Sequence, residues 1–223
     1  MINGQSAGKD FAYLLGVYFG DASIVKRTEN CYTFTIEAID KDFLERTVIE
    51  LGSFTGKTPN IFERSRKTSS GKTVYALTLS DKLTFKQFID DTGGCKYIPD
   101  YVADWPEENR ISFLEGVLDS DGWVSKRTTK FGISQFRMGY STSYSWTYDI
   151  KRLMESVGIL CGNIGEYILK SGRKMLRFDI QMKSFVKSKL QFTSKRKQDR
   201  VDQYEMLKMR SNPQRLYAMT NQV

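Results

Sequence analysis

The chain contains nearly the same apolar segment twice, about a hundred residues apart, and each copy includes an acid near its end. Residues 13–22 read YLLGVYFGDA, and residues 113–122 read FLEGVLDSDG. Both are too densely apolar for a surface strand, and each follows polar residues able to cap a helix, so we expect helices over 10–21 and 110–121. A repeat of this length predicts two fused domains of similar fold rather than a solenoid.

The segments after each repeated helix also correspond between the two copies. Alternation typical of strands occurs at 23–25, 32–36, 60–64 and 73–79, and again at 123–125, 136–141, 164–169 and 175–181. Amphipathic helices are expected at 42–52 and 82–92, and again at 148–158 and 184–192. The predicted fold class is therefore α+β, with tandem duplicated αββαββα units related by pseudo-twofold symmetry and two four-stranded antiparallel sheets.

Glycine and proline mark the boundary between the two units. The stretch 93–99 contains two glycines and a proline, and a second proline follows at Pro106. We therefore expect an N-terminal domain over 1–98 and a C-terminal domain over 99–223. Residues 194–223 are basic and then polar, with Pro213 ending any helix before it, so we assign this tail to DNA-backbone contact or packing.

The residue types that are missing limit the chemistry. The 223 residues include no histidine, which excludes a histidine base, a Ser-His-Asp triad and a histidine-ligated metal site. The three cysteines are odd in number and too far apart for a disulfide framework or a zinc site. No apolar run approaches the roughly 20 residues of a membrane span, and the first residues lack the pattern of a secretory signal. We therefore expect a soluble intracellular protein, in the cytoplasm or an organelle, with no membrane partner.

Positive charge gathers on the expected strands and their turns. The formal net charge is +8, which suggests a polyanionic partner. Sheets with basic strands on one face and apolar helices behind the other suit a saddle that enters the major groove of double-stranded DNA; the alternative is solvated charge on an ordinary α+β sheet. The candidate DNA-binding residues are Lys26, Arg27, Arg64, Arg66, Lys72, Lys126, Arg127, Arg137, Arg173, Arg177 and Lys197.

Small residues recur four apart in both repeated helices. Gly16 and Gly20 share one face of the first helix, and Gly116 and Ser120 share the corresponding face of the second. Glycine inside a helix costs about 0.5–1 kcal/mol relative to alanine, and a close approach of two helix backbones would explain its presence. We expect these four residues to form the interface between the two domains.

The two acids that end the helices, Asp21 and Asp121, should then emerge side by side. Each carboxylate would meet the negative end of a helix dipole and the other carboxylate, an arrangement that divalent cations offset. Two metal ions held by carboxylates suit in-line displacement at phosphorus. The alternative is that both acids are polar residues that simply lead into turns.

These residues resemble the LAGLIDADG homing endonucleases, in the single-chain form with two motif copies. Residues 114–122 (LEGVLDSDG) follow the nine-residue motif closely, and residues 14–22 (LLGVYFGDA) keep its glycine and final acid. Residues 96–99 (KYIP), 110–114 (RISFL) and 140–143 (YSTS) also look like parts of that family's pattern. The resemblance implies a monomer whose two motif helices form the domain interface and whose sheets each read half of a long DNA site.

The resemblance also implies the active site. Divalent metal would be bound there, with Mg²⁺ expected, Mn²⁺ plausible and Ca²⁺ a substitute that does not support cleavage. The implied ligands are Asp21, Asp121 and the backbone carbonyls of Gly20 and Ser120. Lys96 and Lys195 match the lysine that the family places near each scissile phosphate. Hydrolysis of both strands would leave a staggered double-strand break, as in intron or intein mobility.

Some positions depart from the family pattern, and other functions stay open. Phe19 stands where the motif has an earlier acid, and Ala22 replaces its last glycine. Asp40 and Ser143 are nearest to the positions where the family often has Gln or Asn to orient water. The alternative functions are an intron RNA maturase, with RNA as its partner, and a non-cleaving LAGLIDADG DNA-binding regulator. Loss of either motif acid would favour the regulator, and both acids are present.

Overall fold

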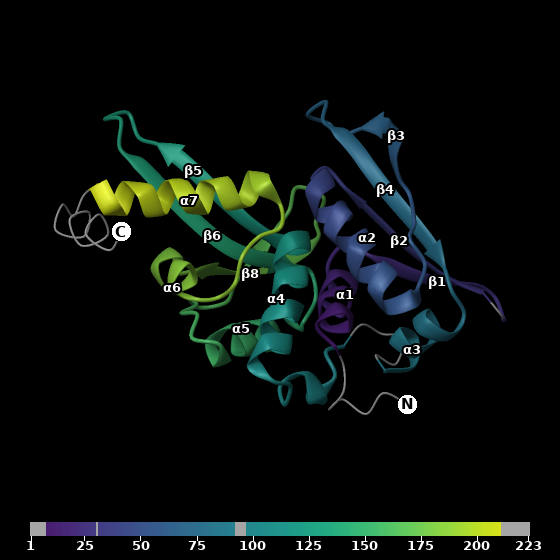
Figure 1. Cartoon of the computed structure of the whole chain (residues 1–223). Helices are drawn as coiled ribbons and strands as arrows, with labels where there is room; N and C mark the ends of the chain where they lie inside the picture. The colour runs from purple at the N-terminus through teal and green to yellow at the C-terminus, as the bar shows by residue number, and fades with distance from the viewer. Residues whose placement is uncertain (1–7, 30, 92–96, 211–223) are drawn as a thin grey trace, which may run out of the picture.

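The computed structural model describes residues 8–29, 31–91 and 97–210 (Figure 1). The helices are α1 (Lys9–Phe19), α2 (Lys41–Thr55), α3 (Leu83–Asp91), α4 (Glu107–Asp121), α5 (Thr147–Ser156), α6 (Met182–Lys187) and α7 (Lys195–Arg210), with a 3₁₀ turn at Asp100–Val102. The strands are β1 (Ser23–Thr28), β2 (Cys31–Ala38), β3 (Ile61–Lys67), β4 (Thr73–Ser80), β5 (Gly122–Thr128), β6 (Ser134–Thr142), β7 (Gly165–Ile168) and β8 (Lys174–Ile180). None of the helices in these ranges is both long and apolar enough to cross a membrane.

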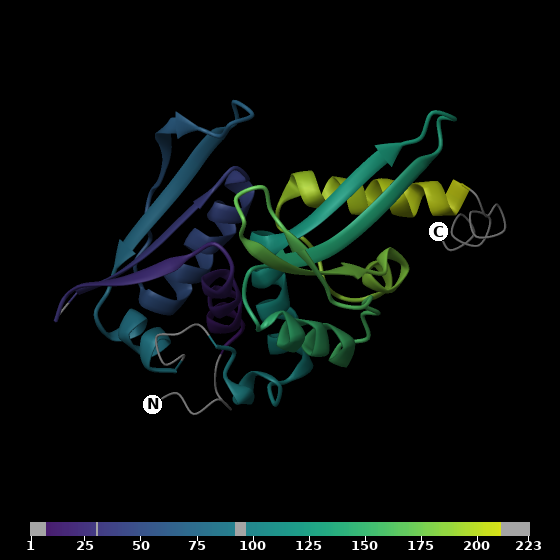
Figure 2. The ribbon, with the colours of Figure 1, turned by 180° about the vertical axis from the view of Figure 1, so that it is seen from behind.

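The described strands form two four-stranded antiparallel sheets with the same connectivity. The strand order is β1-β2-β4-β3 in the N-terminal sheet and β5-β6-β8-β7 in the C-terminal sheet. Figures 1 and 2 show the sheets on opposite flanks of a central helix pair, α1 and α4. The repeated connectivity confirms the duplicated α+β fold that the sequence predicts.

Each sheet buries one face against helices and leaves the other face open. In the N-terminal sheet, Phe34 and Ile36 of β2 are almost fully buried. In the C-terminal sheet, Met138 and Tyr140 of β6 are buried in the same way. Successive side chains of a strand point to opposite faces, so the residues between these lie on the other side. We call that second side of each sheet the open face.

Aromatic side chains join the two halves into one core. Phe19 of α1 contacts Phe113 of α4, with ring centroids 6.0 Å apart, and Trp146 before α5, at 5.5 Å. On the N-terminal side, Phe11 packs against Phe54 of α2 at 5.3 Å. Aromatic pairs at these distances contribute about 0.5–1.5 kcal/mol each beyond their area burial. The two halves are therefore held together by packing as well as by the chain that links them.

Of the tail 194–223, which the sequence analysis assigned to DNA-backbone contact or packing, Lys195–Arg210 form helix α7, which packs on the C-terminal sheet, and 211–223 lie outside the described residues. Val201 is buried, and the Tyr204 ring lies 5.9 Å from the Phe136 ring of β6. Figure 1 shows α7 running along β5 and β6, and in Figure 2 these strands lie in front of it. Phe136 shares its face with buried Met138, two residues further on, so α7 covers the same side of the sheet as the core.

Candidate active site

Helices α1 and α4 touch backbone to backbone at the predicted small residues. A β-carbon on Gly16 would lie 2.1 Å from the carbonyl oxygen of Phe113, and one on Gly116 would lie 2.3 Å from the carbonyl oxygen of Tyr13. A β-carbon on Gly20 would lie 2.1 Å from that of Ser120. No larger side chain fits at either interface glycine without moving a helix. The predicted interface is thus confirmed.

The two motif acids follow the ends of this helix pair. Asp21 is exposed in the turn after α1, and Asp121 is half-buried at the end of α4. Because Gly20 packs against Ser120, the acids that follow them lie at the same end of the interface. Tyr140 of β6 is buried, and its burial, then the negative charges of Asp121 and Asp21, raise the pKa of its hydroxyl. One tyrosine therefore experiences the charge of both acids.

Lys197 of α7 lies at the end of α4, where the sequence did not place it. Its side chain is buried, and Nζ donates to the carbonyl oxygens of Leu118 at 2.9 Å, Asp119 at 2.6 Å and Ser120 at 3.4 Å. Carbonyls at a helix C-terminus have no partner within the helix and carry partial negative charge, so an ammonium satisfies both needs. Burial lowers the pKa of Lys197, although the charges of Asp119, Asp40 and Asp21 oppose this. Lys197, which the sequence analysis listed among the DNA-binding residues, is therefore buried at the end of α4 and not exposed on a strand or turn.

The other two predicted lysines are placed differently. Lys195 is exposed at the start of α7, and its backbone N–H donates to Asp42 Oδ2 at 2.5 Å. A cavity beside the first motif acid is lined by Asp21, Asp40, Ser120, Arg196 and Lys197, among others, and neither Asp121 nor Lys195 is among its lining residues. Lys96 lies outside the described residues. Within the Lys195–Lys197 run, the structure thus brings the third residue to the acids rather than the first.

Asp119, which the sequence analysis did not select, organises the segment before α7. Its buried carboxylate accepts hydrogen bonds from the Tyr13 hydroxyl at 2.9 Å and from the backbone N–H groups of Thr193 at 2.8 Å and Ser194 at 3.3 Å. Burial raises the pKa of this carboxyl, although the hydrogen bonds and Lys197 oppose the shift. Asp119 is the earlier acid of the second motif. The first copy has Phe19 at the corresponding position, and this difference between the copies is the sequence signal that could have singled out Asp119.

Replacing Asp119 with asparagine should destabilise the protein. The amide oxygen can keep the two backbone N–H groups that bond to Oδ1, but the NH₂ group then replaces Oδ2, so the Tyr13 hydroxyl loses its acceptor and Lys197 loses a buried negative charge. We expect the free energy of unfolding to fall by about 1–3 kcal/mol, measured by urea denaturation. Asp199→Asn on the exposed side of α7 is the control and should change it by less than about 0.5 kcal/mol. Equal stability of the two variants would contradict this role for Asp119.

Asp40 is nearest to the position where the family often has Gln or Asn to orient water. Its carboxylate is held by groups from the start of α7. Its oxygens accept hydrogen bonds from Arg196 Nε at 2.9 Å, Arg196 Nη2 at 2.8 Å and the Ser194 hydroxyl at 2.8 Å. Burial opposes ionisation, but the hydrogen bonds from Arg196 and Ser194 outweigh it and lower the pKa of this carboxyl. Asp40 thus ties α7 to the N-terminal half at the rim of the cavity. In the other half, Ser143 accepts a hydrogen bond from Arg173.

The protein donors near the motif acids suit a hard cation only in part. Within residues 8–29, 31–91 and 97–210, no three Asp, Glu, Cys or His side chains lie close enough to share one metal ion. The local donors are carboxylates and helix-terminal carbonyls, which are oxygen ligands of the kind that Mg²⁺ prefers. Because Mg²⁺ keeps several waters or phosphate oxygens, a partial protein ligand set of this type fits it.

Most predicted DNA-binding arginines lie on the open faces. Arg137 pairs across the ladder with Ser125, and Arg177 pairs with Ser141, on the side opposite to Met138 and Tyr140. Arg127 follows Ser125 by two residues and shares its face. In the N-terminal sheet, Arg64 and Arg66 both reach Glu37, which follows buried Ile36 and therefore lies on the open side. The exposed residues Arg27, Lys72 and Arg173 lie at strand ends and hairpin turns.

Two of the predicted DNA-binding lysines lie on the wrong side of their sheets. Lys126 pairs with Phe136, on the face that α7 covers, and its Nζ donates to Gln203 Oε1 at 3.0 Å. Lys26 pairs with buried Tyr32, on the core side of β1. Directly opposed residues of an antiparallel pair point to the same face, so neither lysine projects from the open face. The sequence pattern predicted the strands of these lysines but not the register in which the strands pair.

Taken together, the fold and site define a class: a duplicated α+β protein with two acids at the end of a glycine-packed helix pair and basic open faces on both sides. Solved structures of that class match it. The I-DmoI structure in complex with DNA and Mn has a TM-score of 0.54 at 18% identity, covering 80% of this chain and 93% of that one. The meganuclease I-SmaMI bound to uncleavable DNA has a TM-score of 0.52 at 11% identity, covering 96% and 93%.

A LAGLIDADG homing endonuclease, I-LtrWI bound to target DNA, gives a TM-score of 0.52 at 10% identity and covers 91% of each chain. This chain therefore has the fold of the single-chain LAGLIDADG homing endonucleases, as the sequence resemblance predicts. No family model matches the sequence.

Two curated relatives match about half of the chain. One, an uncharacterized protein of Methanocaldococcus jannaschii, is 31% identical over 124 residues, which are 54% of this chain and 41% of that protein. The other, a DNA polymerase of Thermococcus hydrothermalis, is 26% identical over 121 residues, which are 54% of this chain and 7% of that protein. The matched part thus spans less than half the length of either relative.

Proposed function

We propose that the protein is a site-specific homing endonuclease that makes a staggered double-strand break in a long DNA target by divalent-metal-dependent hydrolysis. The observation that carries this proposal is the placement of Asp21 and Asp121 at one end of the α1–α4 interface, between two sheets with arginines on their open faces. One acid for each strand of DNA, in a monomer with two similar halves, suits a cut in both strands. The similarity in fold to I-DmoI in complex with DNA and Mn, and to I-LtrWI bound to target DNA, supports the same assignment.

Metal ions in this proposal are held by residues at the helix ends. The ligands are Asp21, Asp121 and the backbone carbonyls of Gly20 and Ser120, with Mg²⁺ as the expected ion and Mn²⁺ as a plausible one. Lys197 Nζ also donates to the Ser120 carbonyl at 3.4 Å, so this oxygen would be shared between the ammonium and a bound ion, and the two motif acids supply the negative charge that a divalent cation needs. When bound, such ions would polarise the phosphate and activate water for in-line attack.

The chain's own residues position and neutralise charge around that centre. Lys197 holds the end of α4, and we assign to it the position near the scissile phosphate that the family resemblance implied for Lys195. A buried cation there can stabilise negative charge that develops on the phosphate, without the reorganisation that water requires. Lys96 keeps this proposed role in the other half. The arginines of the open faces bind the DNA of each half-site.

The test is a selection from a randomised duplex library in Ca²⁺, followed by addition of Mg²⁺ to the recovered DNA. We expect one long, partly palindromic site and a staggered cut at its centre. Tight duplex binding without a cut in Mg²⁺ would favour the non-cleaving regulator. If no duplex is enriched, the endonuclease proposal is wrong, and structured RNA, the partner of a maturase, becomes the ligand to test.

A further inference from the structure

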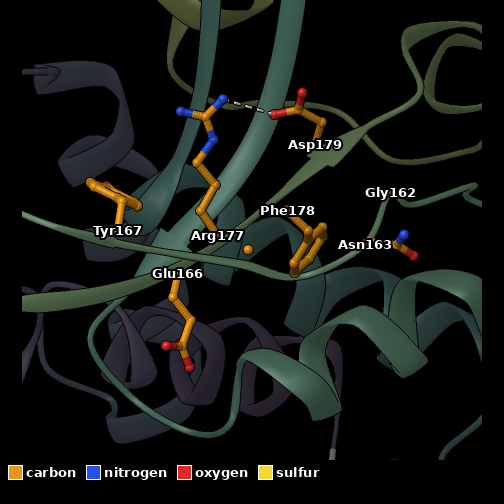
Figure 3. Close-up of a pocket in the computed structure, with 8 residues that line it drawn as sticks. Gly162, Asn163, Glu166, Tyr167, Arg177, Phe178 and Asp179 are labelled. Atoms are coloured by element: carbon orange, nitrogen blue, oxygen red, sulfur yellow. Dashed lines mark hydrogen bonds and ion pairs between the residues drawn. The ribbon is translucent and has the colours of Figure 1, made fainter.

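The open face of the C-terminal sheet carries an arginine, Arg177, that is held by an aromatic ring and by an acid. Trp123 of β5 lies across Gly139 of β6, where a β-carbon would come within 2.5 Å of the indole. The guanidinium carbon of Arg177 lies 4.9 Å from the centroid of the Trp123 rings, and its Nη2 lies 3.1 Å from Asp179 Oδ1. Figure 3 shows Arg177 beside Tyr167 with its guanidinium directed to Asp179. The stacking and the ion pair together restrict how this guanidinium can turn.

Asp179 also binds a second arginine. Arg137 Nη2 lies 2.5 Å from Asp179 Oδ2, so the two carboxylate oxygens each hold one guanidinium. Burial opposes ionisation of Asp179, but the hydrogen bonds from Arg137 and Arg177 outweigh it and lower the pKa of the carboxyl. The group is therefore an anion between two cations and keeps a net positive charge. These side chains are partly exposed, at 37% for Arg177 and 60% for Arg137, so their remaining N–H groups reach solvent.

The N-terminal sheet contains the same kind of group at different positions. Glu37 binds Arg64, with Nη2 2.8 Å from Oε1, and also binds Arg66. The guanidinium carbon of Arg64 lies 5.1 Å from the centroid of the Phe62 ring. Here the acid is on β2 and both arginines are on β3, whereas Asp179 and Arg177 are both on β8. Because the positions differ, simple duplication of one unit does not account for the second group.

Such an arrangement suits base recognition better than phosphate contact. A phosphate binds a flexible cation well, and a neighbouring carboxylate would repel it. Guanine instead presents two acceptors, N7 and O6, on its major-groove edge, and one arginine donates to both only in a fixed orientation. An acid and an aromatic ring that hold a guanidinium in place remove part of the entropy lost on binding.

We propose that Arg177 and Arg64 each read one guanine, in opposite halves of the DNA target, and that Asp179 and Glu37 are the positioning residues that orient them. This proposal rests on the proposed function, since it assumes that the open faces bind duplex DNA. Beyond that function, the proposal names the two arginines that specify a base and identifies the base as guanine. Each acid acts through its arginine and does not itself need to touch DNA.

The test measures binding to the selected duplex in Ca²⁺ by fluorescence anisotropy, with each guanine pair replaced in turn by an A·T pair. With the wild-type protein, one replacement in each half should weaken binding roughly 5- to 150-fold, the usual value of a bidentate arginine–guanine contact. Arg177→Ala should remove that penalty in one half only, and Arg64→Ala should remove it in the other half. Arg127→Ala, an exposed arginine of the same open face as Arg177, is the control and should weaken binding to all sequences alike.

Substitution of Asp179 and Glu37 distinguishes a positioning role from a purely structural one, because only a positioning role predicts a loss of preference for guanine without a loss of overall affinity. Asp179→Asn removes a negative charge that faces DNA, so overall affinity should stay or rise, while the preference for guanine in that half should fall severalfold. Glu37→Gln should do the same in the other half. The proposal is wrong if Arg177→Ala weakens binding to all sequences equally, if the acid variants keep full discrimination, or if neither half requires a guanine. If the wild-type protein enriches no duplex, the proposed function itself is wrong, and this outcome is distinct from a failure of the arginine proposal alone.

Discussion

Replacing both Asp21 and Asp121 with asparagine should abolish double-strand cleavage while DNA binding persists. An amide holds a divalent cation poorly, whereas the side chains of the open faces, to which we assign DNA binding, are unchanged in this variant. Metal ions contribute several kcal/mol to the transition state of phosphodiester hydrolysis, so the cleavage rate should fall roughly a thousandfold or more. The measurement is cleavage of a plasmid that carries the selected site, beside binding to the same site in Ca²⁺.

The single variants refine this result. If each acid serves one strand, Asp121→Asn should abolish cutting of at least one strand, and the product should be nicked rather than linear DNA. Asp199→Asn, on the exposed side of α7, is the matched control and should cut both strands at the wild-type rate. Retained double-strand cleavage by the double variant would exclude the proposed mechanism.

The repeated motif made most of this architecture predictable. Glycine and serine at a spacing of four, followed by an acid, defined the α1–α4 interface and the end at which the acids emerge, because backbone contact between helices permits few other residues. The period-two alternation of the strands was equally clear. The two sheets, and the burial of Phe34 and Met138, follow from that alternation.

The parts that the sequence missed depend on long-range contacts. Which lysine of the run at 195–197 enters the site depends on where α7 begins, and Asp42 and Asp119 determine that from elsewhere in the chain. Helix α7 itself is very polar, and buried Val201 and half-buried Tyr204 are too few apolar positions to predict a packed helix. The misplacement of Lys126 has a similar cause, because register determines the face, and a shift of one residue moves a side chain to the other side.

Gly116→Ala tests the central interface, because two physical effects predict opposite signs. Alanine is the better helix former by about 1 kcal/mol, so helix propensity alone predicts a more stable protein. The added β-carbon would lie 2.3 Å from the Tyr13 carbonyl oxygen and 2.9 Å from the Val17 nitrogen, both backbone atoms of α1 that no side-chain rotation can move. We expect packing to outweigh propensity and the free energy of unfolding to fall by about 1–3 kcal/mol or more, measured by urea denaturation.

The control for this variant is Gly165→Ala in β7, where a β-carbon would meet no atom within 4 Å. It should change the free energy of unfolding by less than about 0.5 kcal/mol. Because α1 and α4 come from opposite halves, the loss in Gly116→Ala should also separate them, so that unfolding followed by tryptophan fluorescence and by circular dichroism no longer coincides. A Gly116→Ala protein more stable than the wild type would mean that the two helices are not in backbone contact, and the acids would then have no common site.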